Sequence, residues 1–229
     1  MNSDLLRCNG RPGYLQRVLF MLLIPLAQGM YFFINLTTTR AHDITTFVDR
    51  LIPFNEWFII PYVFWYVYTF GTLLALAYAD YKTYYRLLFS ILTGMAVCFV
   101  IYFFYPTTVP RPHVPGTNGL QRLVLDIYSD DRPYNCFPSI HMLDTILITL
   151  FLFRHKKGAP LKVTTGIICV LIYMSTLFIK QHSVLDALAS TALGIILFWV
   201  FENERVMRKL SELQRLLPQK RKTYLDGDT

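Results

Sequence analysis

The stretch WFIIPYVFWYVYTFGTLLALAYA, from Trp57 to Ala79, runs without one charged side chain. A helix needs about 20 apolar residues to cross the hydrocarbon core of a bilayer. The length of this stretch therefore predicts a membrane-spanning helix, and a chain that contains it is expected to be an integral membrane protein.

Further apolar blocks lie on both sides of this stretch. Of the 229 residues, 54% are hydrophobic and only 16% are charged, whereas a soluble domain carries roughly 25% charged residues. We therefore expect an all-α fold, a six-span transmembrane helical bundle in which residues 1–229 form a single integral membrane domain. The expected spans are Val18–Leu36, Trp57–Ala79, Leu87–Tyr105, Pro138–Phe153, Val163–Ile179 and Leu185–Phe201.

The basic residues are distributed unevenly over the connections between these blocks. Most of the 22 lysines and arginines lie in residues 1–17, 80–86, 154–162 and 202–229. Because cytoplasmic loops are enriched in Lys and Arg, we expect both termini in the cytoplasm, with residues 1–17 as a cytoplasmic N-terminus and 202–229 as a basic cytoplasmic tail. The apolar spacing of the tail predicts a helix near anionic headgroups, so the net charge of +7 indicates membrane lipids and no nucleic acid as partners.

The stretch FPSIHMLD (Phe137–Asp144) opens the fourth and shortest block. Proline disfavours helical backbone in the residue before it, so the helix is expected to begin just after Pro138, with Ser139 as its N-cap. The free N–H groups of such a helix start, among them that of Ile140, bind phosphate readily. His141 lies in the first turn, where it can give a proton to an oxygen of the bound group.

His182 and Asp186 are four residues apart, so they share one face of a helix that begins near Ser183. An acid in this position can bond one imidazole nitrogen, fix the tautomer, and leave the other nitrogen as a nucleophile or base. Acids inside membrane spans are usually paired and functional. The alternative is a structural hydrogen bond between helices.

Arg111 stands between two prolines in the connection that follows Tyr105. Its guanidinium suits bidentate phosphate binding, although a loop arginine can also contact lipid headgroups. Together with Ser139 and the two histidines it makes a set of groups for phosphoryl transfer. One histidine would attack phosphorus and the other would protonate the leaving oxygen, without a metal ion or other cofactor.

Three short motifs, in this order, resemble the signatures of the type 2 phosphatidic acid phosphatase superfamily. Its members include membrane lipid phosphatases, lipid phosphotransferases and soluble vanadium haloperoxidases, of which the apolar blocks exclude the last. The signatures are Lys-x6-Arg-Pro, Pro-Ser-Gly-His and Ser-Arg-x5-His-x3-Asp. They are matched by Arg111-Pro112, by Pro138-Ser139-Ile140-His141, and by Ser175 with His182 and Asp186.

The resemblance implies a function and a role for each matched residue. It implies a membrane lipid phosphatase that hydrolyses a lipid phosphomonoester or pyrophosphate at the extracytoplasmic face of the cell membrane. His182 would be the nucleophile that forms a phosphohistidine, and Asp186 would orient it. His141 would be the general acid for the leaving alcohol, while Arg111 and Ser139 would hold phosphate oxygens.

The sequence departs from the superfamily pattern at three positions. Phe104 stands where the family has lysine, Ile140 replaces the glycine of the second motif, and Thr176 replaces the arginine of the third. Two of the usual phosphate-binding cations are therefore missing. Candidates to replace them on the same side of the membrane are Lys180, Arg122, Arg132 and His113.

Three functions stay open at this stage. The looser motifs are similar to those of the inositol phosphorylceramide synthase-like branch, which implies transfer of a phospho-headgroup to a lipid alcohol in place of hydrolysis. A non-catalytic lipid-binding membrane protein is the third possibility. The sequence predicts a lipid phosphate substrate without naming the lipid, and it does not predict the oligomeric state.

Two features have no assigned role. Asp144 lies outside the superfamily pattern and either makes a polar contact between spans or pairs with Lys180 or Arg111. The aromatic residues of the second span either line a lateral path for the lipid or face the bilayer. These residues are Tyr62, Phe64, Trp65, Tyr66 and Tyr68.

Overall fold

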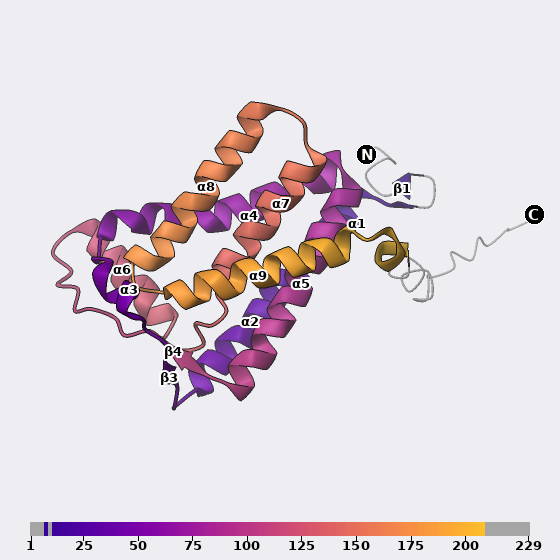
Figure 1. Ribbon diagram of the computed structural model, residues 1–229. Helices are drawn as coiled ribbons and strands as arrows, with labels where there is room; N and C mark the ends of the chain where they lie inside the picture. The colour runs from indigo at the N-terminus through magenta and orange to yellow at the C-terminus, as the bar shows by residue number, and fades with distance from the viewer. Residues whose placement is uncertain (1–6, 9–10, 209–229) are drawn as a thin grey trace, which may run out of the picture.

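The computed structural model describes residues 7–8 and 11–208, and these residues are mostly helical, as predicted (Figure 1). The expected helix of the basic tail lies almost entirely outside them. The described residues contain two short pairs of β-strands. They are β1 (Arg7–Cys8) with β2 (Arg11–Pro12), antiparallel, and β3 (His42–Asp43) with β4 (Thr107–Thr108), parallel.

Seven of the helices carry the apolar blocks. They are α1 (Tyr14–Met21), α2 (Leu23–Thr37), α4 (Ile59–Ala79), α5 (Tyr81–Phe104), α7 (Ile140–His155), α8 (Ala159–Phe178) and α9 (Val184–Glu202). The shorter helical elements are α3 (Phe47–Leu51), the 3-10 turn η2 (Glu56–Phe58) and α6 (Gly119–Asp130).

Within residues 7–8 and 11–208, five helical segments are long and apolar enough to cross a membrane, which marks an integral membrane protein. They are Tyr14–Thr37, Glu56–Ala79, Tyr81–Phe104, Ala159–Phe178 and Val184–Glu202. Each contains most of one predicted span, although the third begins at Tyr81, earlier than the expected Leu87.

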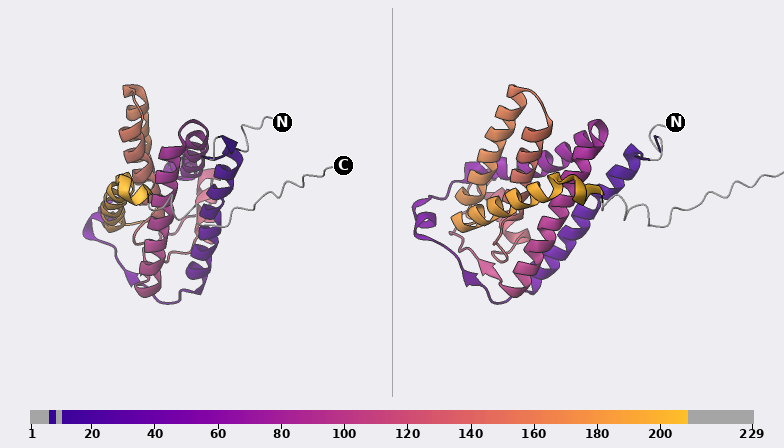
Figure 2. Two further views of the ribbon diagram at one scale, coloured as in Figure 1. Left: turned by 90° about the vertical axis from the view of Figure 1, so that its right-hand side faces the viewer. Right: turned by 45° about the vertical axis from the view of Figure 1, so that its right-hand side comes forward.

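The prediction of six spans depends on α7, which is shorter than the other long helices. Its 16 residues extend over about 24 Å, less than the roughly 30 Å of the hydrocarbon core. The helix packs against α4, α5, α8 and α9 and lies in the middle of the bundle (Figure 2). Most of its side chains are therefore shielded by protein, and its first turn lies within the bundle.

One end of the bundle holds the α4–α5 and α7–α8 connections, together with the start of α1 and the end of α9 (Figure 1). Ion pairs join these elements: Arg86 pairs with Glu202 at 2.9 Å and Lys156 with Asp80 at 2.8 Å. Partial burial opposes ionisation of Asp80, but hydrogen bonds from Lys156 and Thr83 prevail and lower its pKa to about 2. This charged end is the one for which the sequence predicts a cytoplasmic location.

The opposite end holds the connection from β4 to α7 in place. Asn35 on α2 donates to the carbonyl oxygens of Arg132 and Tyr134, at 3.1 and 3.0 Å. Thr107 in β4 accepts from the backbone N–H groups of Cys136 and Phe137. The chain that enters α7 is therefore anchored to both α2 and β4, which determines where the first turn of α7 lies.

Gly194 lets α9 approach α7 closely, since a Cβ atom there would overlap the side chain of Ile146. We expect Gly194→Leu to lower the free energy of unfolding by about 1–3 kcal/mol, because an overpacked helix contact forces neighbouring side chains or backbone to move. The midpoint of thermal unfolding in detergent measures this. Gly71→Leu on α4 is the control, because a Cβ at Gly71 meets no atom within 4 Å; equal shifts for both variants would contradict the prediction.

Candidate active site

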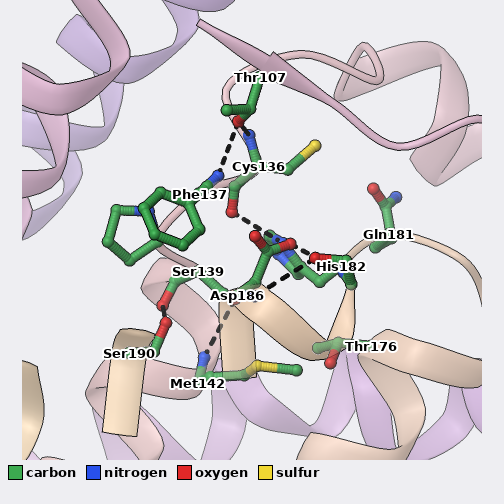
Figure 3. Close-up of polar contacts among 12 residues, drawn as sticks. Thr107, Cys136, Phe137, Ser139, Met142, Thr176, Gln181, His182, Asp186 and Ser190 are labelled. Carbon is green, nitrogen blue, oxygen red and sulfur yellow. Dashed lines mark hydrogen bonds and ion pairs between the residues drawn. The ribbon is translucent and has the colours of Figure 1, made fainter. Parts of the chain in front are cut away.

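His182 lies immediately before α9 and has a defined tautomer. Its Nδ1 is 3.2 Å from Asp186 Oδ2 and 3.1 Å from the carbonyl oxygen of Cys136 (Figure 3). A carbonyl oxygen only accepts hydrogen bonds, so Nδ1 carries the proton and Nε2 keeps its lone pair. The predicted contact between His182 and Asp186 is confirmed, and Cys136 is a second partner that the sequence did not indicate.

The start of α9 fixes the position of Asp186. Ser183 is the N-cap, and its Oγ accepts from the Asp186 N–H, while Asp186 Oδ2 accepts from the Ser183 N–H at 2.8 Å. This reciprocal capping box satisfies two backbone donors and holds the carboxylate in one orientation. Asp186 is fully buried, and its Oδ1 has no hydrogen-bond partner among the described residues.

His141 faces His182 from the first turn of α7, with 5.7 Å between the ring centroids. Two rings of α4 cover it, with centroids 4.3 Å away for Trp65 and 4.9 Å away for Tyr62. The predicted N-cap is confirmed, since Ser139 Oγ accepts from the backbone N–H of Met142. Capping at Ser139 therefore places the second histidine beside the first.

The two histidines line a cavity of about 630 Å³, including its mouth. Three aromatic side chains of α4, those of Tyr62, Trp65 and Tyr66, form part of its wall. These three side chains therefore face the cavity, whereas Phe64 is 42% exposed and does not line it.

Acidic and polar side chains that the sequence did not single out complete the wall, among them Asp130, Asp131 and Asn135. Asp131 accepts a hydrogen bond of 2.6 Å from the hydroxyl of Tyr31 on α2. Burial raises the pKa of the Asp131 carboxyl, and it outweighs the opposing effects of Tyr31 and of the positive charge of Arg111. Within the described chain, none of the residues that line this cavity is a lysine or arginine.

Arg111 does not line the cavity and contacts Gln181, the residue that precedes His182 in the chain. The guanidinium stacks on Tyr128 at 4.3 Å, donates to the Tyr128 carbonyl at 3.0 Å, and donates to Gln181 Oε1 at 2.5 Å. Two buried donors, Arg111 Nε and Gln181 Nε2, have no acceptor among the described residues. Gln181, which is only 3% exposed, belongs to no motif and could not be selected from the sequence.

Comparison with known protein families matches residues 42–200 to the PAP2 superfamily. The chain belongs to this superfamily. The matched region includes α7, which carries His141, and the turn before α9, which carries His182. Membership confirms the resemblance seen in the three motifs, and it supports phosphatase chemistry at the level of the family.

One solved structure with a similar fold is the crystal structure of Aquifex aeolicus LpxE. It aligns with a TM-score of 0.50 and 18% sequence identity, and the alignment covers 77% of this chain and 94% of that chain. At this identity the similarity concerns the fold alone. A search of curated proteins found no match.

The departures from the PAP2 superfamily pattern have visible consequences. Phe104 is 77% exposed at the end of α5. Thr176 is buried and ends α8: its Oγ1 donates to the Tyr173 carbonyl, and its own carbonyl accepts from the N–H groups of Gln181 and His182. Position 176 therefore shapes the backbone that presents His182, but it supplies no cation.

Lys180 does not take the place of the missing cations. Its Nζ donates to the carbonyl oxygens of Asp49 and Ile52 at the end of α3, and partial burial lowers its pKa. Lys180 therefore joins α3 to the turn before His182, and the expected contact of Lys180 with phosphate is not what the structure has. The backbone at Lys180 has a φ of 55°, and this left-handed residue turns the chain from α8 toward His182.

The other candidate cations are likewise absent from the cavity wall. Arg132 Nη1 donates to the Leu36 carbonyl, and Arg122 Nε donates to the Gly116 carbonyl. His113 is exposed. Within the described residues, no group of three His, Cys, Asp or Glu side chains gathers that could hold a metal ion.

Asp144 is buried in the second turn of α7, at 1% exposure, and its Oδ1 has no hydrogen-bond partner among the described residues. The hydrogen bonds of Lys180 and Arg111 go to other groups. The suggested pairing with either cation is therefore not present.

Proposed function

We propose that the protein is an integral membrane lipid phosphatase that hydrolyses a lipid phosphomonoester or pyrophosphate through a phosphohistidine intermediate at the extracytoplasmic face. The observation that carries this proposal is the state of His182. Its Nδ1 proton is held by two acceptors, so Nε2 is left as a nucleophile beside a second histidine and a cavity.

In the first step the Nε2 lone pair of His182 attacks phosphorus, and the bond from phosphorus to the leaving oxygen breaks. The bonding electrons stay on that oxygen, which takes a proton from His141. Asp186 stabilises the positive charge that develops on the phosphorylated imidazole. Water then attacks phosphorus while His141 accepts one of its protons. The bond from phosphorus to Nε2 breaks and its electrons return to Nε2, so phosphate leaves and both histidines are restored.

We assign several donors to the phosphate oxygens, although Ile140 is the only one of their residues in the described chain that lines the cavity. Buried donors without an acceptor cost about 1–3 kcal/mol each, so Arg111 Nε and Gln181 Nε2 support a site that an anion completes. The N–H of Ile140 belongs to the start of α7, where the helix dipole favours negative charge. Ser139 Oγ accepts from Met142, which leaves its hydroxyl hydrogen for a phosphate oxygen.

The proposal also places the protein in the membrane. With α7 as the sixth span, both termini lie in the cytoplasm and residues 1–229 form one integral membrane domain. The site elements gather at the end of the bundle opposite the ion-paired connections (Figure 1). Because α7 is short, its first turn would lie near headgroup depth, and a lipid could keep its tails in the bilayer during the reaction.

We expect Gln181→Ala to reduce kcat/KM for a lipid phosphate about 10- to 100-fold, since a hydrogen bond to a charged group contributes about 1.5–3 kcal/mol. Phosphate release by purified protein measures this, with inhibition by inorganic phosphate as a second readout. Gln121→Ala on α6 is the matched control, because Gln121 bonds Thr117 and Glu56 away from the cavity. If both readouts matched those of the wild type, Gln181 would not be a phosphate ligand.

The decisive test of the function uses a panel of lipid phosphates, with and without acceptor alcohols. Phosphate release without an acceptor would support hydrolysis. Product that forms only when an alcohol is added would favour the phosphotransferase, which the superfamily also contains. Lipid binding without any reaction would favour a non-catalytic lipid-binding protein and overturn the proposal.

A further inference from the structure

The cavity next to the two histidines has a charge that a phosphate site by itself does not explain. Asp130 and Asp131 both line it, and no lysine or arginine does within the described chain. Asp131 interacts electrostatically with His182, and both acids interact with Tyr66. Carboxylates this close to a bound phosphate would repel it unless a positive group of the ligand lies between them.

The aromatic side chains of the same wall favour a positive group. Tyr62, Trp65 and Tyr66 come from α4, and Tyr31 comes from α2. The face of an aromatic ring attracts an ammonium group, and the attraction is larger where water is excluded. Since Tyr31 donates its hydroxyl to Asp131, one ring and one carboxylate are held side by side.

Asn135 provides an independent indication of a hydrogen-bond donor in the ligand. It lines the cavity, is 1% exposed, and its Oδ1 has no partner among the described residues. Its Nδ2 donates to Thr38 Oγ1, and that hydroxyl donates to the Ile34 carbonyl. The hydroxyl can therefore only accept from Asn135, which fixes the orientation of the amide and leaves Oδ1 as an acceptor without a donor.

We propose that the cavity binds a lipid phosphate that carries a protonated amine close to phosphorus. The amine lies against Asp131, Asn135 and the rings of α4, and the phosphate lies against His182. The phosphate half of this arrangement rests on the proposed function. The amine belongs either to the lipid itself, as in the phosphate monoester of an amino-alcohol lipid, or to the headgroup, as in a phosphodiester of an amino alcohol, which is a substrate for headgroup transfer.

A binding experiment tests the amine site without turnover. Phosphoethanolamine and n-propyl phosphate differ only by a methyl group in place of the ammonium. We expect purified wild-type protein to bind phosphoethanolamine at least about tenfold more tightly in calorimetry, because a charged hydrogen bond and cation–π contacts act together. Equal affinity for the two phosphates would overturn the proposal.

Variants locate the effect within the cavity. Asp131→Asn removes the charge but still offers Tyr31 an acceptor, so the loop should stay in place and the affinity ratio should fall toward one. Asp126→Asn is the matched control, because Asp126 is an exposed acid of the same helix α6 outside the cavity. Equal unfolding midpoints verify folding, and a ratio unchanged in Asp131→Asn would contradict the assignment.

Turnover of paired lipids separates this proposal from the proposed function. Phosphatidylethanolamine and an amino-alcohol lipid monophosphate are each compared with their N-acetyl forms, in which the ammonium is replaced by an uncharged amide and the phosphate is unchanged. A preference for the amine in the first pair assigns it to the headgroup, and in the second pair to the lipid. Hydrolysis without any preference would sustain the phosphatase and overturn the amine site, whereas tight phosphoethanolamine binding without hydrolysis would do the reverse.

Discussion

His182→Ala is expected to lower the rate of phosphate release about 10⁴-fold or more, because it removes the nucleophile that forms the covalent intermediate. The remaining groups would still bind the lipid, so binding of inorganic phosphate should weaken much less than turnover. Phosphate release from a lipid substrate under saturating conditions measures the effect. The unfolding midpoint of His182→Ala in detergent should equal that of the wild type, which verifies that the variant is folded.

The covalent step has its own readout. Wild-type protein quenched during turnover of a radiolabelled lipid phosphate should carry an acid-labile label, and His182→Ala should carry none. His113→Ala is the matched control, because His113 is an exposed histidine in the connection between α5 and α7. Equal phosphate release from wild type and His182→Ala would rule out His182 as the nucleophile.

His141→Ala is expected to lower turnover of an ordinary lipid phosphate about 10²- to 10⁴-fold, the usual contribution of a general acid. The loss in the rate of the first step, formation of the labelled intermediate, should nearly disappear for a lipid phosphate with a nitrophenyl leaving group, because a weakly basic leaving oxygen needs no proton. Single-turnover rates of labelling for the two substrates measure this dependence.

The leaving-group dependence separates proton transfer from packing. His141 contacts Trp65 and Tyr62, so its removal also leaves space under two rings. Trp65→Phe is the control, since it disturbs the same contact and keeps both histidines. If His141→Ala lost equal activity with both leaving groups, His141 would act through structure or phosphate binding and not as an acid.

Local patterns predicted the parts of the site that depend on neighbours in the chain. Ser139 and Ser183 were recognisable as helix starts, because an N-cap bonds backbone only two or three residues ahead. The contact of His182 with Asp186 follows from the spacing of four on one helix face. No helix was predicted between Tyr105 and Pro138, where the structure has α6. This helix also had a local signal, the spacing of Leu120, Val124 and Ile127, which marks one apolar face.

Long-range contacts decided the rest of the site. Arg111 reaches Gln181, Tyr31 on α2 reaches Asp131, and Lys180 is drawn to the carbonyl groups of α3. None of these pairs shares a periodic pattern, since the partners are 70, 100 and 131 positions apart. Lys180 was expected at the phosphate because it lies on the same predicted side of the membrane as the two histidines. The side of the membrane does not determine which group a side chain contacts.

The sequence by itself therefore determined the membrane class, the long apolar helices, the N-caps Ser139 and Ser183 and the histidine pair, because hydrophobic length and hydrogen bonds within a few residues control these features. Only the tertiary structure decided what surrounds the pair. It brought the acids and Asn135 before α7 against the rings of α4 and α2, because helix packing and the anchoring of the connection by Asn35 and Thr107 join segments that are distant in the chain.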